Sequence, residues 1–535
     1  MDGWLTYTLD RKKNGFRLLH LEIQNHTVLA PKGKKCSIEF FNTQFEESIT
    51  ISEKPYSTVI IGANGVGKSF VLAAVADIFR YLHQLKNYDN SKVESPGFRF
   101  AIQYYENGRN YKISNLPDQT GLVKMDGNAK EKISCWVDGH PNGLHVCDLP
   151  CAVLASSITI ADRFKTQKQP DNFYWYLGAR NENLPNSTGT KTIVKKTVDA
   201  IAECLTHDSY FKDKLFDLLE CLDLERKMEI EYSVRYKNVY FADPITEEHF
   251  VQIFDNWEEA FKAAGMKRKD QPWSHNKFKQ IRQNPENITL MVEYMKRVKE
   301  NQLLGRRSHL VYDINGKTFK EDWQAIKLLT SLDVLSYPKI RIHKKINART
   351  EEEFLFENSS SGETAMLCQF INILSRIEQH SLVLIDEPET SSHPNWQIRY
   401  IDWINRIYQR FHTCHFVIST HSHFLLSDLE EGSSAIVALD RDKETGDIVN
   451  LAEGMNTYGW TTDDILYEVF RIRNRRNEAL ERDLERAIQL IESSGLNNKE
   501  EVDDLLKRFN RVYRGDRDPL GKFIKELEEY AKSQS

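Results

Sequence analysis

The sequence predicts a mixed α/β protein in which an α/β unit is interrupted by a helical insertion and followed by a helical C-terminal region. Three observations predict this organisation. An apolar run at 57–65 ends in a Gly-rich turn, and apolar residues follow it at helical spacing over 69–85. Helical spacing dominates between about 190 and 335. Short apolar runs of strand length then return from 336 onward.

Residues 1–185 are predicted to form the N-terminal lobe of the α/β unit. Alternating or continuous apolar residues between turn signals predict its strands. The hairpin among them turns at Asn107-Gly108, a pair that favours tight turns. Strands are expected at 16–25, 35–42, 47–52, 57–65, 98–114 (the hairpin) and 151–160.

The insertion is predicted at 186–335, the C-terminal lobe at 336–456, and a helical region for a partner or for self-association at 457–535. Within the insertion, helices are expected at 191–221, 246–264, 286–303 and 320–334, with a short strand near 227–236. Within the C-terminal lobe, strands are expected at 339–346, 381–386, 414–420 and 434–440.

Composition limits the classes of protein that remain. The 535 residues carry a net charge of −6 and are 40% hydrophobic, which excludes a wholly disordered chain. No apolar run approaches the ~18–20 residues that span a bilayer, and the first residues lack the pattern of a secretory signal. We therefore expect a cytoplasmic protein without a membrane partner. Its eight cysteines form no zinc-ligand pattern and are expected to be buried free thiols.

The most specific motif is G-x-x-x-x-G-K-S at 62–69. Glycines allow the backbone to fold around phosphates, with successive N–H groups and a helix N-terminus facing the anion. The Lys68 ammonium is expected to reach the β- and γ-phosphates of ATP, and the Ser69 hydroxyl to coordinate Mg²⁺. The residues expected to bind ATP here are Asn64, Gly65, Val66, Gly67, Lys68, Ser69 and Phe70.

A second motif, LVLIDEPE at 382–389, places carboxylates at the end of an apolar strand. We expect Asp386 to take part in binding Mg²⁺ and Glu387 to polarise the attacking water. A third motif, Ser-Thr-His-Ser at 419–422, puts His421 after another apolar strand. His421 can hydrogen-bond the γ-phosphate as a catalytic group, although a structural histidine is an equally good interpretation of this motif alone.

A fourth motif, SSSGE at 359–363, precedes a predicted helix. Hydroxyls and amides at a helix N-terminus form an anion-binding surface. Ordinary N-capping by Ser361 explains the same residues locally and does not exclude that role.

The order of these four motifs resembles the ABC-type ATPase head shared by transporters, the SMC/Rad50 group, RecF and OLD-like proteins. DEPETSSHP followed by STHS is similar to the soluble branch of that family. The resemblance implies a head-to-tail dimer, in which Ser360, Ser361 and Gly362 contact the γ-phosphate of ATP held by the other subunit. Ser359 stands where the family usually has leucine. The family's Q-loop glutamine is not fixed by spacing, because Gln167 and Gln169 both lie in the region.

Three further stretches, at 155–164, 174–181 and 456–470, resemble the PtuA family of ATPases from bacterial Septu anti-phage systems and certain retrons. This resemblance implies a separate HNH nuclease partner, PtuB-like, and in a retron a reverse transcriptase with its RNA–DNA product. The chain itself has no HNH-like cluster, and Asp440-Arg441-Asp442 is expected to be a turn. The alternatives are a RecF- or Rad50-like DNA-repair ATPase and an ATP-dependent clamp that does not hydrolyse ATP.

Three surfaces are candidates for contact with partners. Cations and aromatic residues are interleaved in the segment Lys262–Arg282, which suits DNA, a solvated loop or a protein interface. A strand at 339–346 is expected to present a basic face made of Lys339, Arg341, His343 and Lys345. A helical stripe suits self-association, a partner or packing on the chain's own ATPase head; it consists of Leu480, Leu484, Ile488 and Ile491.

Overall fold

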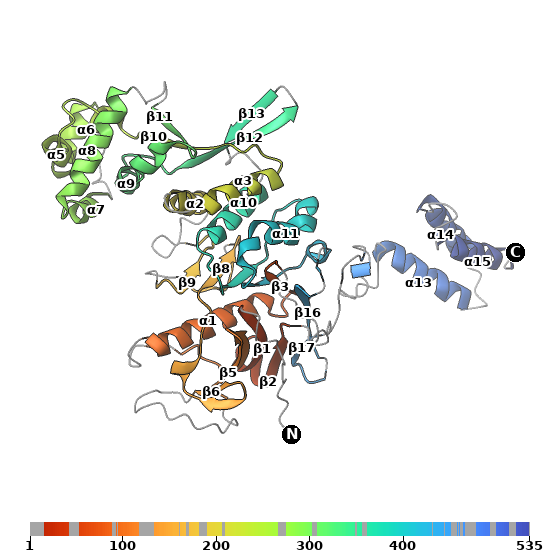
Figure 1. Cartoon of the computed structure of the whole chain (residues 1–535). Helices are drawn as coiled ribbons and strands as arrows, with labels where there is room; N and C mark the ends of the chain where they lie inside the picture. The colour runs from red at the N-terminus through yellow and green to blue at the C-terminus, as the bar shows by residue number, and fades with distance from the viewer. Residues whose placement is uncertain are drawn as a thin grey trace. The chain divides into compact units, whose positions relative to one another are not determined.

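The structure is a computed structural model of the chain, and it divides into two units, Met1–Ile465 and Leu466–Ser535 (Figure 1). The described residues are 15–41, 53–87, 93, 95–116, 133–159, 161–166, 171–180, 190–205, 209–265, 274–301, 308–347, 350–355, 361–427, 429–430, 432–442, 444–450, 457, 460, 464–465, 478–492, 499–512 and 520–533. The strand predicted at 47–52 falls outside them.

The first unit is built on a sheet of thirteen strands in the order β7-β6-β5-β4-β1-β2-β17-β16-β3-β15-β14-β8-β9. Strands far apart in the sequence are therefore neighbours in it. The strands are β1 (Arg17–His26), β2 (Ala30–Glu39), β3 (Tyr56–Gly62), β4 (Arg99–Glu106), β5 (Arg109–Ser114), β6 (Ser134–Val137), β7 (His140–Asn142), β8 (Val153–Ser157), β9 (Tyr174–Tyr176), β14 (Leu382–Asp386), β15 (His415–Ser419), β16 (Ser434–Arg441) and β17 (Ile448–Asn450).

The half of this sheet that carries the motifs is parallel. β16, β3, β15, β14, β8 and β9 are paired in parallel, in that order. Their apolar runs are buried on both faces, as parallel strands require. Helix α1 (Lys68–Asn87) packs across β3, β8, β14 and β15, with ten of its side chains buried. The carboxyl ends of these strands therefore meet at one edge, where α/β proteins bind ligands.

The other half of the sheet is mainly antiparallel. β1 pairs with β2 and β4, and β4 continues into β5 through the predicted hairpin. Asn107 and Gly108 both have positive φ, at 49° and 79°, which suits the twist of a two-residue hairpin. Large aromatic side chains from this half, such as Phe16, Tyr104 and Tyr111, pack with α1 residues in the main core.

The insertion contains the predicted helices, with short α4 and α7 beside them, and more strand than expected (Figure 1). β10 forms where a strand was predicted, but it joins a four-stranded antiparallel sheet in the order β11-β10-β12-β13. The helices are α2 (Thr190–Leu205), α3 (Ser209–Cys221), α4 (Lys237–Tyr240), α5 (Glu247–Asp255), α6 (Trp257–Ala263), α7 (Ser274–Ile281), α8 (Pro285–Glu300) and α9 (Lys317–Ser331). The strands are β10 (Met228–Ser233), β11 (His309–Asp313), β12 (Lys339–Asn347) and β13 (Thr350–Leu355).

This second sheet lies across the predicted boundary at 335/336. β12, expected in the C-terminal lobe, pairs with β10 from Met228↔Ile342 to Glu231↔Lys339. The chain then returns to the main sheet through α10 (Ser361–Leu374), β14 and α11 (Pro394–Ile407). The division before the C-terminal region falls between Ile465 and Leu466, against the predicted 456/457.

The basic face predicted on β12 is wrong at two of its four positions, Arg341 and His343. Arg341 donates from Nε to Glu231 Oε2 over 2.6 Å, and Glu231 is only 2% exposed. His343 is 4% exposed and lies 3.6 Å from Glu229. These two side chains are therefore matched with acids of the neighbouring strand β10.

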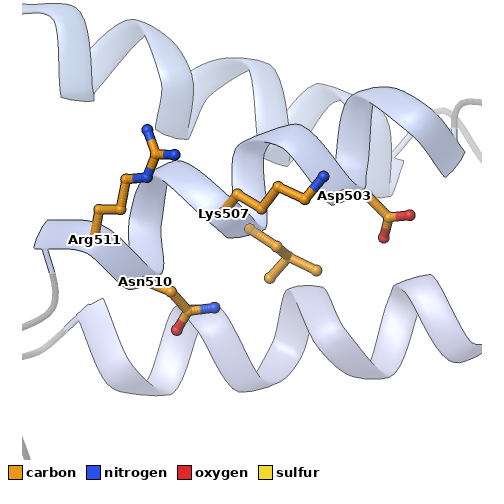
Figure 2. A pocket seen from close by; sticks show the side chains of 5 residues that line it. Asp503, Lys507, Asn510 and Arg511 are labelled. Carbon is orange, nitrogen blue, oxygen red and sulfur yellow. The ribbon is translucent and has the colours of Figure 1, made fainter.

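The described residues of the second unit form three helices around a small core of their own: α13 (Glu478–Glu492), α14 (Lys499–Val512) and α15 (Leu520–Ser533). Leu480 and Leu484 of the predicted stripe pack against this core, whereas Ile488 is 44% exposed. Packing within the bundle thus accounts for Leu480 and Leu484, and the side chain of Ile491 lies outside the described part of the structure. Figure 2 shows a pocket of about 480 Å³ whose lining residues all belong to α14: Asp503, Leu506, Lys507, Asn510 and Arg511.

These observations confirm the predicted architecture, an α/β unit with an insertion and a helical C-terminal region. All eight cysteines are free thiols; Cys151 is exposed, Cys204 is half-buried and the rest are buried. The turn predicted at Asp440-Arg441-Asp442 is wrong for its first two residues, because Asp440 and Arg441 end β16 and pair with β17. Asp442 accepts hydrogen bonds from the N–H groups of Glu444 and Thr445, as expected of a turn. Within the described residues, no helix combines the length and apolar character needed to cross a bilayer.

The buried Glu231 gives a stability prediction. Replacing Arg341 with alanine removes the guanidinium from this buried carboxylate, while His309 stays 2.7 Å away. Removing one partner of a buried ion pair is expected to lower the free energy of unfolding of the insertion by about 3 kcal/mol. The measurement is urea denaturation combined with hydrogen exchange at β10 and β12. The control, Lys54→Ala, breaks the exposed pair with Glu430 and should lose less than about 1 kcal/mol. Equal losses in both variants would contradict the prediction.

Candidate functional site

The P-loop lies between β3 and α1, at the carboxyl edge of the parallel strands. β3 ends at Gly62, which pairs with Leu439 of β16. A Cβ atom at Gly62 would collide with the backbone oxygen of Leu439, so only glycine allows the chain to turn here. Asn64 and Gly65 are exposed at the tip of the loop, while Val66 is buried beneath it.

Lys68 is the first residue of α1, and its side chain folds back over the loop. Nζ donates to the carbonyl oxygen of Gly62 over 2.8 Å and lies 3.2 Å from Nδ1 of His421. Lys68 is only 4% exposed, and burial lowers its pKa to about 8, while the nearby carboxylates Glu387, Glu389 and Asp386 oppose that change. The ammonium group is thus held at the place where phosphates are expected.

Asp386 ends β14 directly beside Ser419, which ends β15. The Ser419 hydroxyl donates to Asp386 Oδ1. Burial raises the pKa of Asp386, and hydrogen bonds from the hydroxyls of Ser419 and Ser69 lower it. The structure therefore brings Asp386 and Ser69, which are 317 positions apart in the sequence, into contact.

Glu387 follows in a left-handed conformation, with φ of 48°, which turns the chain sharply after the strand. Its Oε1 lies 3.5 Å from Nε2 of His421. This contact lowers the pKa of Glu387, with a further contribution from Lys68. Since a lysine ammonium can only donate, Nδ1 of His421 accepts from it, and the ring proton faces Glu387 from Nε2. Lys68, His421 and Glu387 form one connected polar group.

Glu389 belongs to this group although the sequence reasoning assigned it no role. Its Oε1 accepts from the backbone N–H of His421 over 2.6 Å. Its Oε2 is buried and has no hydrogen-bond partner within the described chain. Burial raises the pKa of this carboxyl group. The only signal for Glu389 in the sequence was its position two residues after Glu387.

The SSSGE motif is described from Ser361 onward, where α10 begins. Ser359, Ser360, Gln167 and Gln169 lie outside the described residues. Gly362 is packed so tightly that a Cβ there would collide with the backbone oxygen of Ser391, in the loop that follows Glu389. The helix N-terminus that the family resemblance assigns to a second nucleotide is thus in contact with the acidic motif of its own chain.

Phe70 lies beside the P-loop with its ring 5.9 Å from His26 and 4.9 Å from the Arg163 guanidinium. It is partly buried against the main core. These contacts place the end of β1 and the segment after β8 next to the start of α1.

Ser69 and Asp386 fit a magnesium ion. A hydroxyl and a carboxylate are oxygen donors of the kind that Mg²⁺ prefers, and Mg²⁺ commonly takes its other ligands from phosphates and water. Accordingly, the described residues contain no cluster of three or more His, Cys, Asp or Glu side chains that could hold a metal alone. Bound there, Mg²⁺ would neutralise charge on the phosphates.

The structure does not support base stacking by two aromatics of the Lys262–Arg282 segment. Phe278 is fully buried and stacks on Phe254 at 4.2 Å, and His275 Nδ1 contacts the Phe254 carbonyl oxygen at 2.9 Å. Arg282 pairs with Asp255 at 2.8 Å. Base stacking on DNA is therefore not supported at Phe278 and His275. Other members lie outside the described residues: Lys267, Arg268, Lys269, Asp270 and Trp273.

The chain matches a known protein family. A family described as "AAA ATPase domain" matches residues 35–426, which include the P-loop, the insertion, Asp386 and His421. The chain belongs to this family. The prediction of an ATP-binding P-loop ATPase is therefore confirmed at the level of the family. No curated protein matches the chain.

Solved structures with partial similarity include two SMC heads and a recombination protein. The SMC head domain from Thermotoga maritima shares 11% identity over 81% of this chain and 99% of its own, with a TM-score of 0.32. The Smc head domain from Pyrococcus furiosus, bound to the C-terminal domain of ScpA, shares 13% identity over 86% and 100%, with a TM-score of 0.28. The RecF recombination mediator shares 12% identity over 82% and 99%, with a TM-score of 0.27.

Proposed function

We propose that this chain binds and hydrolyses ATP with Mg²⁺, and that its nucleotide state controls a separate nuclease. The convergence of Lys68, His421 and Glu387, from three different elements, supports the first part most directly. A P-loop alone would serve nucleotide binding. A carboxylate and an imidazole within 3.5 Å of each other, beside the phosphate-binding lysine, add the groups that hydrolysis needs.

Each side chain has a distinct role in this proposal. Lys68 leaves the Gly62 carbonyl oxygen and binds the β- and γ-phosphates. Ser69 and Asp386 hold Mg²⁺. Glu387, kept ionised by its lowered pKa, accepts a proton from the attacking water, and His421 contacts the γ-phosphate.

Two substitutions separate binding from turnover. Lys68→Ala should abolish ATP binding because the phosphates lose their main cation. Glu387→Gln should keep ATP bound while turnover falls by ~10²–10⁴, the usual effect of removing a general base. A fluorescent nucleotide measures affinity, and phosphate release measures turnover. Equal turnover by wild type and Glu387→Gln would contradict the assignment.

The family resemblance further supports a head-to-tail dimer with two sandwiched nucleotides. In it, Ser360, Ser361 and Gly362 contact the γ-phosphate held by the other subunit, at the N-terminus of α10. The close contact of Gly362 with Ser391 would then connect the partner's nucleotide with the chain's own acidic motif.

Mixing two inactive variants tests this dimer. Lys68→Ala removes the P-loop cation, and Ser361→Arg blocks the surface for the partner's nucleotide. Each variant alone should be inactive, while the mixture should recover at most one intact composite site per heterodimer. Phosphate release against mixing ratio is the measurement. Normal hydrolysis by either variant as an isolated monomer would exclude the composite site.

The nuclease partner is proposed from the PtuA resemblance. We assign this chain to a bacterial anti-phage complex as the sensor and scaffold for a PtuB-like HNH nuclease, in a Septu system or in a retron with its reverse transcriptase and RNA–DNA product. The sequence itself carries no HNH-like cluster. A RecF-like DNA-repair ATPase is the second candidate, favoured by the same ATP motifs without a nuclease partner.

Purification with neighbouring gene products distinguishes these candidates. We expect an HNH protein to co-purify, and DNA cleavage by the complex to depend on ATP concentration. Lys68→Ala in the same complex should remove the dependence, since a ligand changes an equilibrium only through different affinities for the two states. Cleavage by this chain alone that survives Lys68→Ala would contradict the proposal. Co-purification of no partner would favour the repair ATPase.

A further inference from the structure

The position of His421 depends on contacts outside the catalytic group. His421 lies in the short connection between β15 and the 3-10 helix His423–Leu426, and it belongs to neither element. Its ring contacts Lys68 and Glu387 at 3.2 and 3.5 Å, distances at which small backbone shifts would separate the atoms. ATP would draw Lys68 away from the ring, so a second anchor is needed to keep the imidazole in place during turnover.

The backbone of His421 has such an anchor in Glu389. The His421 N–H donates to Glu389 Oε1 over 2.6 Å, which is short for an N–H···O bond and typical of a charged acceptor. The other carboxylate oxygen is buried. Glu389 contacts the backbone of His421, whereas Glu387 contacts its imidazole ring. The two acids therefore act on different parts of the same residue.

Glu389 is itself fixed by a compact turn. Its carbonyl oxygen accepts from both the backbone N–H and the hydroxyl of Ser392, at 2.9 and 2.8 Å. Ser392 in turn accepts from Gln397 of α11 at 2.9 Å, and the Ser422 hydroxyl donates to the same Gln397 at 2.6 Å. The residue after His421 is therefore tied to the same turn. This arrangement closes a ring of hydrogen bonds around the histidine.

We propose that Glu389 is a positioning residue for hydrolysis, one that holds the His421 backbone so that its imidazole stays between the γ-phosphate and Glu387. The proposal rests on the proposed ATPase function and deepens it. Glu389 needs no contact with the nucleotide for this role. This role requires an oxygen acceptor on a side chain of this length, and it does not require a negative charge.

The difference between an acceptor oxygen and a negative charge determines which variants test the proposal. Glu389→Ala removes the acceptor and leaves the His421 N–H unpartnered. Glu389→Gln keeps an acceptor oxygen at the same reach and removes the charge. The control variant is Glu430→Ala, which removes a glutamate outside the site from an exposed ion pair with Lys54.

For Glu389→Ala we expect kcat to fall about 10- to 100-fold, the range for a displaced proton-transfer or phosphate-contacting group. KM and the affinity for a fluorescent ATP analogue should stay within about twofold, because the P-loop supplies ground-state binding. Glu389→Gln should recover most of the lost kcat, and Glu430→Ala should match wild type. Thermal unfolding of each variant shows whether the fold is kept.

Specific outcomes would overturn the proposal. Wild-type kcat in Glu389→Ala would show that the anchor has no role. Loss of kcat in Glu389→Gln equal to that in Glu389→Ala, with both folded, would show that charge rather than position matters. If Glu389→Ala also lost affinity for ATP to a similar extent, Glu389 would contribute to ATP binding instead. By contrast, a wild-type chain that binds ATP and never hydrolyses it would contradict the proposed function itself.

Discussion

The parallel pairing of β14 between β15 and β8 determines where every acidic group of the candidate site lies. In this register Asp386 stands opposite Ser419 on one side and Ser157 on the other. β3 pairs with the far side of β15, so Gly62 and the P-loop emerge at the same edge. A register shift of one residue would turn Asp386 toward the opposite face of the sheet. The site therefore depends on the packing of these strands, whose apolar side chains are buried against the layers on both sides of the sheet.

Charge balance at this edge explains how a nucleotide can be recognised. Lys68 is a buried cation near three carboxylates, those of Glu387, Glu389 and Asp386. Burial lowers the pKa of Lys68 to about 8, and the three carboxylates oppose this change. In the proposed function, free ATP would add further negative charge beside these carboxylates, whereas ATP with Mg²⁺ would bring its own cation.

Much of this could be predicted from the sequence, because continuous apolar runs identify parallel strands and the P-loop has a fixed spacing. The basic face on β12 could not be judged in that way. The partner of Arg341, Glu231, lies 110 positions earlier in the chain, and only the sheet register brings them together. An aromatic residue such as Phe278 suits a protein core as well as a base-stacking surface, so the sequence alone could not distinguish the two. Glu389 belongs to the LVLIDEPE motif, but the role proposed for it depends on a hydrogen bond from the His421 backbone, which residue spacing does not reveal.

The path from the nucleotide to the insertion is short. Helix α10, which begins at Ser361, packs directly on α2, the first helix of the insertion. A buried hydrogen bond of 3.1 Å joins Asn372 to Thr197 across this contact, and Arg376 pairs with Glu203 at 2.6 Å just beyond it. Close-packed helices linked by buried polar contacts shift together rather than deform. A nucleotide that moves the N-terminus of α10 would therefore move α2 with it, and a partner bound to the insertion would sense the nucleotide state without touching it.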